Sequence, residues 1–166
     1  MIEFMVIAAP RSATTWVSNW LTTDTTLCIH DPLFNTHFND LDKIQSKKML
    51  GVSCTGLYLF PEFVNKHPAR KIILHRELNE INDSLIAIGI PPISESNHRS
   101  LDNIEGIHMD WREVFHNPKL IYEYLLRKDF DTERHRYLKE IEMQPNFSGL
   151  TINKEVTKRL FALLGE

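Results

Sequence analysis

The feature that most constrains the fold of this 166-residue chain is a short apolar run near its start, Glu3 to Ala9 (EFMVIAA). Its apolar residues are not spaced as in an amphipathic helix, which predicts a strand that is buried on both faces. A turn is predicted at Pro10 to Ser12, and Thr14 to Leu21 then has its tryptophans at helical spacing. A buried strand that passes directly into a helix is typical of α/β proteins with a parallel sheet.

The alternation of strand and helix continues along the chain. Further strands are predicted at 26–30, 50–54, 70–75 and 106–109, and further helices at 61–66, 78–88, 118–126, 132–143 and 153–164. The segment 90–103 contains two prolines, three serines and few apolar residues, and we expect a loop there. The pattern predicts a three-layer α/β/α fold with a mainly parallel sheet of about four or five strands.

Composition narrows the class of protein. The length and the 42% of hydrophobic residues predict a single domain that covers residues 1–166. The formal net charge of -3 does not favour a nucleic-acid partner, and no run approaches the roughly 20 apolar residues that span a bilayer. Cys28 and Cys54 do not form a CxxC pair, so we expect neither a disulfide framework nor a structural metal site. A reducing, cytoplasmic setting fits these features best.

The segment Ala8 to Trp16, AAPRSATTW, has the properties of a phosphate-binding loop. It lies where the first strand gives way to a helix, and unpaired backbone N–H groups at a helix start favour an anion. A fixed positive charge, short hydroxyl groups and a flat ring are all present, on Arg11, Ser12, Thr14, Thr15 and Trp16. It is not a Walker A loop, because the Gly-Lys-Ser/Thr ending is absent. The alternative is an ordinary strand-to-helix turn whose hydroxyls cap the helix.

This segment resembles the loop Pro-Lys/Arg-Ser-Gly-Thr-Thr-Trp of sulfotransferases, which belong to the P-loop NTPase-like folds and use the donor PAPS (3′-phosphoadenosine 5′-phosphosulfate). Every position matches except Ala13, where the family normally has Gly. The resemblance implies that residues 11–16, Ala13 included, hold the 5′-phosphosulfate of PAPS. It also implies that Arg11 places positive charge beside the group that is transferred.

A second motif follows the predicted strand 70–75. Arg76 and Ser84 are eight residues apart, and a guanidinium with a hydroxyl can hold a terminal phosphate. Their types and spacing resemble the sulfotransferase pattern Arg-Asn-Pro-x-Asp-x-x-x-Ser, which reads the 3′-phosphate of the donor. Glu77, Leu78 and Glu80 depart from that pattern, although Glu80 keeps the acidic character. The alternative is that Arg76 forms an ion pair with Glu80 at helical spacing.

A third match is softer. The stretch His108 to Leu126 resembles the family's strand ending in Tyr-Glu-Asp-Leu, which is followed by Asp-Pro and a helix. Because the family's aromatic residue lies beside the adenine, the resemblance makes Trp111 a candidate for stacking on the base. The alternative is a core aromatic residue in front of a helix.

The catalytic base is not fixed by the resemblance. One branch of the family uses a His near the position of Cys54, where this chain has none, and other branches use a Glu soon after the first helix. Asp31 is the best analogue of that Glu, with His30 and His37 as competitors because His titrates near neutral pH. His98, in the segment 90–103, is the remaining candidate. A polar loop around Asp31 without catalysis is the alternative.

The leading hypothesis is therefore a sulfotransferase that uses PAPS, releases PAP (adenosine 3′,5′-bisphosphate) and needs no metal. Its acceptor, a hydroxyl or amine of a small molecule or glycan, is not specified by the sequence. A P-loop nucleotide kinase is a second hypothesis, and it is disfavoured by the missing Walker Lys. A non-catalytic nucleotide-binding or interaction protein on the same fold is the third.

Overall fold

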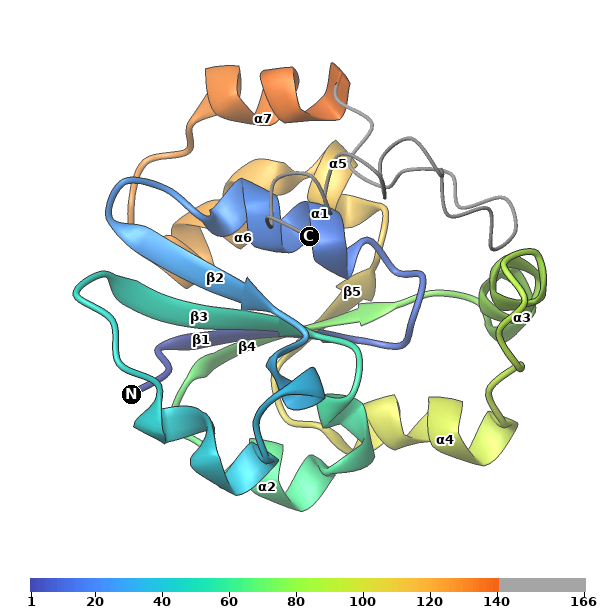
Figure 1. The fold of residues 1–166 in the computed structure, drawn as a ribbon. Coiled ribbons are helices and arrows are strands. Elements are labelled where there is room, and N and C mark those ends of the chain that lie inside the picture. Colours follow the sequence, from blue (N-terminus) through green and yellow to red (C-terminus); the bar gives the residue numbers. More distant parts are fainter. Residues whose placement is uncertain (141–166) are drawn as a thin grey trace, which may run out of the picture.

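The computed structural model of the chain describes residues 1–140, which form a parallel sheet between two layers of helices (Figure 1). The sheet has five strands in the order β2-β3-β1-β4-β5, and every neighbouring pair is parallel. The strands are β1 (Phe4–Ala8), β2 (Thr26–His30), β3 (Met49–Cys54), β4 (Arg70–His75) and β5 (Ile107–Asp110). The predicted three-layer α/β/α fold with a parallel sheet is confirmed.

Strand β1 lies at the centre of the sheet, and its side chains enter two hydrophobic cores, one on each face of the sheet. Met5 and Ile7 face one side of the sheet, where they join the first core, and Phe4 and Val6 face the other side. All four side chains are at most 1% exposed. The continuous apolar run of β1 is thus explained, because each face of a central parallel strand is covered by helices.

The helices divide between the two faces (Figure 1). One face is covered by α1 (Thr14–Leu21), α5 (Glu113–His116), α6 (Pro118–Leu126) and α7 (Thr132–Glu140). The core on the other face is covered by α2 (Pro61–Lys66) and the 3₁₀ helices η2 (Phe38–Lys43), η3 (Leu57–Leu59) and η4 (Ser100–Asn103), and Ile81 and Leu85 of α3 (Leu78–Ile86) also enter it. Helix α4 (Glu95–Arg99) lies on the same side without a buried residue (Figure 1). A short 3₁₀ helix, η1 (Pro32–Phe34), follows β2 directly. Helix α3 lies beyond the carboxyl ends of the strands.

Most predicted elements match the structure to within two residues, and the end of α3 shows why. The N–H of Gly89 donates to the carbonyl of Ile86, and the N–H of Ile90 donates to the carbonyl of Leu85, each at 3.0 Å. This pair of bonds is a Schellman motif, which needs a left-handed residue at the position of Gly89 (φ 76°). The predicted helix stop at Gly89 therefore has its expected physical cause.

The prediction of a loop at 90–103 was wrong for most of that segment. Helix α4 begins after Ser94, whose hydroxyl accepts a hydrogen bond from the N–H of Asn97 at 3.2 Å. The 3₁₀ helix η4 follows at once and buries Leu101 completely. One capping serine and one buried leucine were enough to order a segment of polar composition. The predicted helix at 153–164 lies outside the described residues.

No helix within residues 1–140 combines the length and the apolar character that crossing a membrane requires.

Candidate functional site

The candidate site lies at the carboxyl edge of the sheet, around the loop between β1 and α1. The chain runs from β1 to the strands on one side of it, β2 and β3, and later crosses to β4 and β5 on the other side. In open parallel sheets such a reversal of strand order leaves a crevice at the carboxyl ends, where ligands bind. Segments that follow β1, β2, β4 and β5 meet at this edge.

The loop between β1 and α1 has a left-handed backbone at two positions. Arg11 has φ 66°, and Ala13, the residue before the helix, has φ 63°. The first helical hydrogen bond runs from the N–H of Val17 to the carbonyl of Ala13, at 2.9 Å. The N–H groups of the preceding turn point out of the helix start, where an anion is stabilised. The methyl group of Ala13 thus occupies a conformation that glycine adopts freely.

Three residues of the predicted phosphate loop, Ser12, Thr14 and Trp16, are buried. Ser12 is fully buried, and its hydroxyl lies 3.5 Å from the carbonyl of Pro10. Trp16 is only 8% exposed, and its indole N–H donates to the carbonyl of Leu138 at 3.1 Å. Its ring contacts other aromatic rings of the core, among them Trp20 at 5.3 Å between centroids. It also contacts Phe115 of α5 and His135 of α7, so the flat ring of the predicted phosphate loop is packed in the core and little of it is left for a ligand.

The two predicted phosphate motifs meet in space. Arg11 donates from Nε to the hydroxyl of Ser84, 2.8 Å away and 73 positions later in the chain. Arg76 donates from a terminal nitrogen to the carbonyl of Arg11. The sequence predicted that Arg11 and Ser84 serve opposite ends of one ligand, and the structure brings their side chains into direct contact.

Arg76 also forms the ion pair that the alternative interpretation predicted. Its Nε donates to Glu80 Oε2 at 2.9 Å. The other carboxylate oxygen of Glu80 accepts a hydrogen bond from Arg112 at 2.7 Å. These two hydrogen bonds, first from Arg76 and then from Arg112, lower the pKa of Glu80, so the group is a carboxylate.

Trp111 follows β5 at the same edge and contacts both arginines. The guanidinium carbon of Arg76 lies 4.7 Å from the ring centroid, and that of Arg112 lies 5.1 Å from it. The indole nitrogen of Trp111 is buried without a hydrogen-bond partner. The sequence selected Trp111 but missed Arg112, which the final strand of the sheet carries to the same edge.

The base candidates His30 and Asp31 lie at the end of β2. The ring nitrogen Nε2 of His30 is 3.2 Å from Asp31 Oδ2 and 3.2 Å from each hydroxyl of Thr14 and Thr15. Asp31 Oδ1 accepts hydrogen bonds from the N–H and the hydroxyl of Thr55, at 2.5 and 3.0 Å. The side chain of His30 is 33% exposed and that of Asp31 only 9%, so His30 is the member of the pair that a ligand can reach.

The other two histidine candidates have structural contacts. His37 caps η2, where its Nδ1 accepts a hydrogen bond from the N–H of Asn39 at 3.3 Å. His98 of α4 lies 2.9 Å from the carbonyl of Arg76 and so holds the main chain at the site. Within residues 1–140, no group of three or more His, Cys, Asp or Glu side chains could hold a metal ion.

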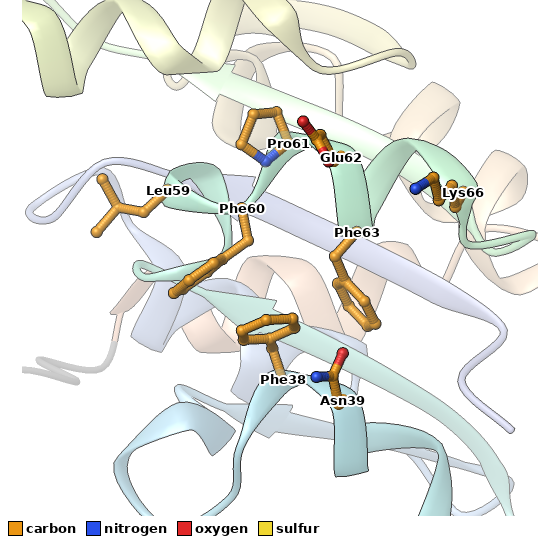
Figure 2. A pocket seen from close by; sticks show the side chains of 8 residues that line it. All are labelled: Phe38, Asn39, Leu59, Phe60, Pro61, Glu62, Phe63 and Lys66. Carbon is orange, nitrogen blue, oxygen red and sulfur yellow. The ribbon is translucent and has the colours of Figure 1, made fainter.

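A cavity of about 460 Å³ lies between η2 and the segment that runs from η3 into α2, and no residue of the β1–α1 loop lines it (Figure 2). It is lined by the rings of Phe38, Phe60 and Phe63, and the first two are stacked with centroids 4.4 Å apart. Phe38 lies seven residues after Asp31, and Phe60 lies five residues after Thr55. The cavity is thus built on the two segments that position the Asp31 carboxylate.

Comparison with known proteins gave no assignment: no protein-family model matches the sequence, and no curated protein matches it.

Proposed function

We propose that the protein is a sulfotransferase that moves a sulfuryl group from PAPS to a hydroxyl or amine. The observation that carries the proposal is the contact of Arg11, Ser84 and Arg76 beside the start of α1. Motifs that the sequence assigned to the two phosphate ends of one donor thus form one cluster of cations and hydroxyls. The resemblance to sulfotransferases in sequence order supports the same assignment.

The β1–α1 loop is suited to the 5′-phosphosulfate. The N–H groups at the start of α1 and the guanidinium of Arg11 stabilise negative charge there. In the transfer, the bond between sulfur and the bridging phosphate oxygen breaks while a bond from sulfur to the acceptor oxygen or nitrogen forms. Negative charge develops on the departing phosphate of PAP in the transition state, and these donors stabilise that charge.

The proton of the acceptor goes to the pair His30 and Asp31. His30 is the more exposed of the two, and its Nε2 faces the carboxylate of Asp31. We assign the proton transfer to Nδ1 of His30, because Nε2 faces the Asp31 carboxylate and the hydroxyls of Thr14 and Thr15. Asp31 is the positioning residue that fixes the orientation of the ring and stabilises its protonated form. Thr55 holds Asp31 in turn through two hydrogen bonds.

A nucleotide kinase is the competing function, and nothing in the site favours it. The loop lacks the Lys of a Walker A motif, and we expect transfer to proceed without Mg²⁺. A non-catalytic nucleotide-binding protein would keep the phosphate contacts but would have no use for the His30 and Asp31 pair.

The first prediction is that PAP binds and stabilises the protein, and that it binds more tightly than ATP. PAP carries a 3′-phosphate for Arg76, whereas all three phosphates of ATP are on the 5′ side. Calorimetry measures both affinities, and the melting temperature should rise with PAP because the ligand binds the native state. Equal or tighter binding of ATP would contradict the assignment to PAPS.

The variant Arg76→Ala tests which end of the donor this arginine reads. It should weaken the binding of PAP by about 1.5–3 kcal/mol, the contribution of a charge-assisted hydrogen bond. The binding of adenosine 5′-phosphosulfate, which has no 3′-phosphate, should hardly change. Equal losses for the two ligands would mean that Arg76 acts only on the fold, through Glu80 and the carbonyl of Arg11.

A further inference from the structure

Three arginines from distant parts of the chain converge at the carboxyl edge of the sheet. Arg11 follows β1, Arg76 follows β4 and Arg112 follows β5. Arg76 donates to the main chain of Arg11 and shares the ring of Trp111 with Arg112. Like charges repel, so such a cluster requires anions, either from the protein or from a ligand.

The anion at the centre of this cluster is Glu80. It accepts from Arg76 with one oxygen, at 2.9 Å, and from Arg112 with the other, at 2.7 Å. A phosphate group binds two guanidiniums in the same manner, with one oxygen for each. The carboxylate of Glu80 therefore occupies the place between two arginines that a terminal phosphate would fill.

The charges around Glu80 leave the cluster positive. Arg112 has a second carboxylate partner, Asp110, at 3.3 Å, while the Nε of Arg11 binds the neutral hydroxyl of Ser84. Three guanidiniums thus face two carboxylates. A doubly charged phosphate would neutralise this cluster more fully than Glu80 does.

The exposure of the three side chains shows which of them can move. The side chain of Arg76 is 19% exposed, whereas those of Glu80 and Arg112 are 37% and 42% exposed. Arg76 is held by its hydrogen bond to the carbonyl of Arg11 and by its contact with the ring of Trp111. Glu80 is held by its hydrogen bonds to Arg76 and Arg112, so its side chain can turn into solvent once a phosphate takes over both bonds.

We infer that Arg112 is a further phosphate-binding residue and that Glu80 is an internal competitor, which the 3′-phosphate of the ligand displaces. The inference rests on the proposed function, which supplies a ligand with a 3′-phosphate. Glu80 keeps Arg76 and Arg112 paired until a phosphate arrives, and a ligand without a 3′-phosphate leaves it in place. The contact thus raises the selectivity of the site at the expense of affinity.

Calorimetry with PAP and adenosine 5′-monophosphate on three variants tests this inference. Glu80→Gln keeps the size of the side chain but removes its charge, and it should bind PAP about fivefold more tightly than the unaltered protein, because a partly exposed ion pair is the interaction that PAP no longer has to displace. Arg112→Ala should bind PAP about tenfold more weakly. Glu95→Gln is the matched control, because Glu95 pairs with Arg99 at the same helical spacing on the exposed face of α4. Adenosine 5′-monophosphate should bind all four proteins alike.

Several results would overturn the inference while the proposed function stands. If the unaltered protein binds PAP and Glu80→Gln binds it equally or more weakly, Glu80 orients Arg76 and does not compete with phosphate. Unchanged PAP affinity in Arg112→Ala would remove Arg112 from the site. Circular dichroism checks that both variants fold, and Arg112→Lys, which keeps the charge without the planar fork, should lie between the unaltered protein and Arg112→Ala.

If PAP does not bind the unaltered protein, the proposed function fails, and the arginine cluster is then tested with inorganic phosphate. Phosphate should raise the melting temperature of Glu80→Gln more than that of the unaltered protein and of Glu95→Gln. Equal shifts in the three proteins would overturn the inference as well. The two failures are therefore distinguishable.

Discussion

At the end of β2, two neighbouring polar residues, His30 and Asp31, differ in exposure and in their contacts. His30 and Asp31 are adjacent in the sequence, and the residue types alone left open which of them takes a proton. Asp31 has a left-handed backbone, with φ 42°, which turns its carboxylate inward to Thr55. His30 stays at the surface of the site with Nε2 toward Asp31. For the proposed transfer, this arrangement favours Asp31 as the group that orients the ring and His30 as the group that takes the proton.

At this scale we predict that Asp31→Asn lowers turnover strongly and leaves PAP affinity nearly unchanged. The amide oxygen of Asn can still accept the hydrogen bonds from Thr55, so the loop should keep its structure. It carries no charge to stabilise a protonated His30, so the loss should be confined to the transition state. Turnover is measured as PAP released from PAPS with an acceptor that supports transfer.

Two histidine variants complete this test. His30→Ala should lose at least as much activity as Asp31→Asn, and His37→Ala should keep it, because the contacts of His37 are the cap of η2 and the ring of Phe38. Full activity in both His30→Ala and Asp31→Asn would assign the base elsewhere. Loss in His37→Ala alone would transfer the role to that residue.

At the scale of elements, the junction of β1 and α1 determines the geometry of the site. The junction turns within five residues, and two of them, Arg11 and Ala13, adopt positive φ. An L-residue in this conformation costs about 1–2 kcal/mol relative to glycine. The buried strand before the junction and the buried helix after it hold the loop in this shape.

We therefore predict that Ala13→Gly stabilises the protein by about 1 kcal/mol, because relief of the left-handed strain exceeds the greater freedom of glycine in the unfolded chain. Chemical denaturation measures the free energy of unfolding. Ala87→Gly is the matched control: Ala87 has φ -59° at the end of α3, so glycine should destabilise it by about 0.5–1 kcal/mol. A loss of stability in Ala13→Gly would mean that the loop does not carry this strain.

For the whole molecule, the packing of β3 against β1 limits which side chains the sheet accepts. Gly51 of β3 is paired with Phe4 of β1, and a Cβ atom on Gly51 would lie 2.0 Å from the Phe4 ring. Phe4 is fully buried and belongs to the core that α1 and α6 cover. The ring cannot move away without disturbing the packing of this core.

We predict that Gly51→Ala destabilises the protein by about 1–3 kcal/mol, the usual cost of overpacking. Unfolding in urea gives this value. In a Phe4→Leu background the same substitution should cost less, since the clashing ring is gone, and the double-mutant cycle should be non-additive. Gly56→Ala is the control with a small effect, because the nearest atom there is a flexible Leu33 methyl at 3.1 Å. Equal costs at Gly51 in both backgrounds would contradict the proposed clash.

The sequence by itself determined the elements and their order. The unbroken apolar run of β1 is buried on both faces only between two layers of helices. Gly89 marked the end of a helix because glycine adopts the left-handed backbone that the stop needs, and Pro118 marked a start because its fixed φ suits the first turn. The same local physics located the loop around Arg11 and the end of β4 before Arg76. Helix α4 escaped prediction because its order depends on Ser94 and on the burial of Leu101, which composition does not reveal.

Only the tertiary structure decided which of the selected residues meet. Sequence spacing could not foresee that Arg11 binds Ser84, that Arg112 joins Arg76 at Trp111, or that Trp16 enters the core, because each contact depends on the strand order β2-β3-β1-β4-β5. Parallel strands carry their carboxyl ends to one edge, whatever their separation in the chain. Local propensity determines each helix and strand. The contacts among the segments at the carboxyl edge depend on the strand order, which is set by the packing of helices on both faces of the sheet.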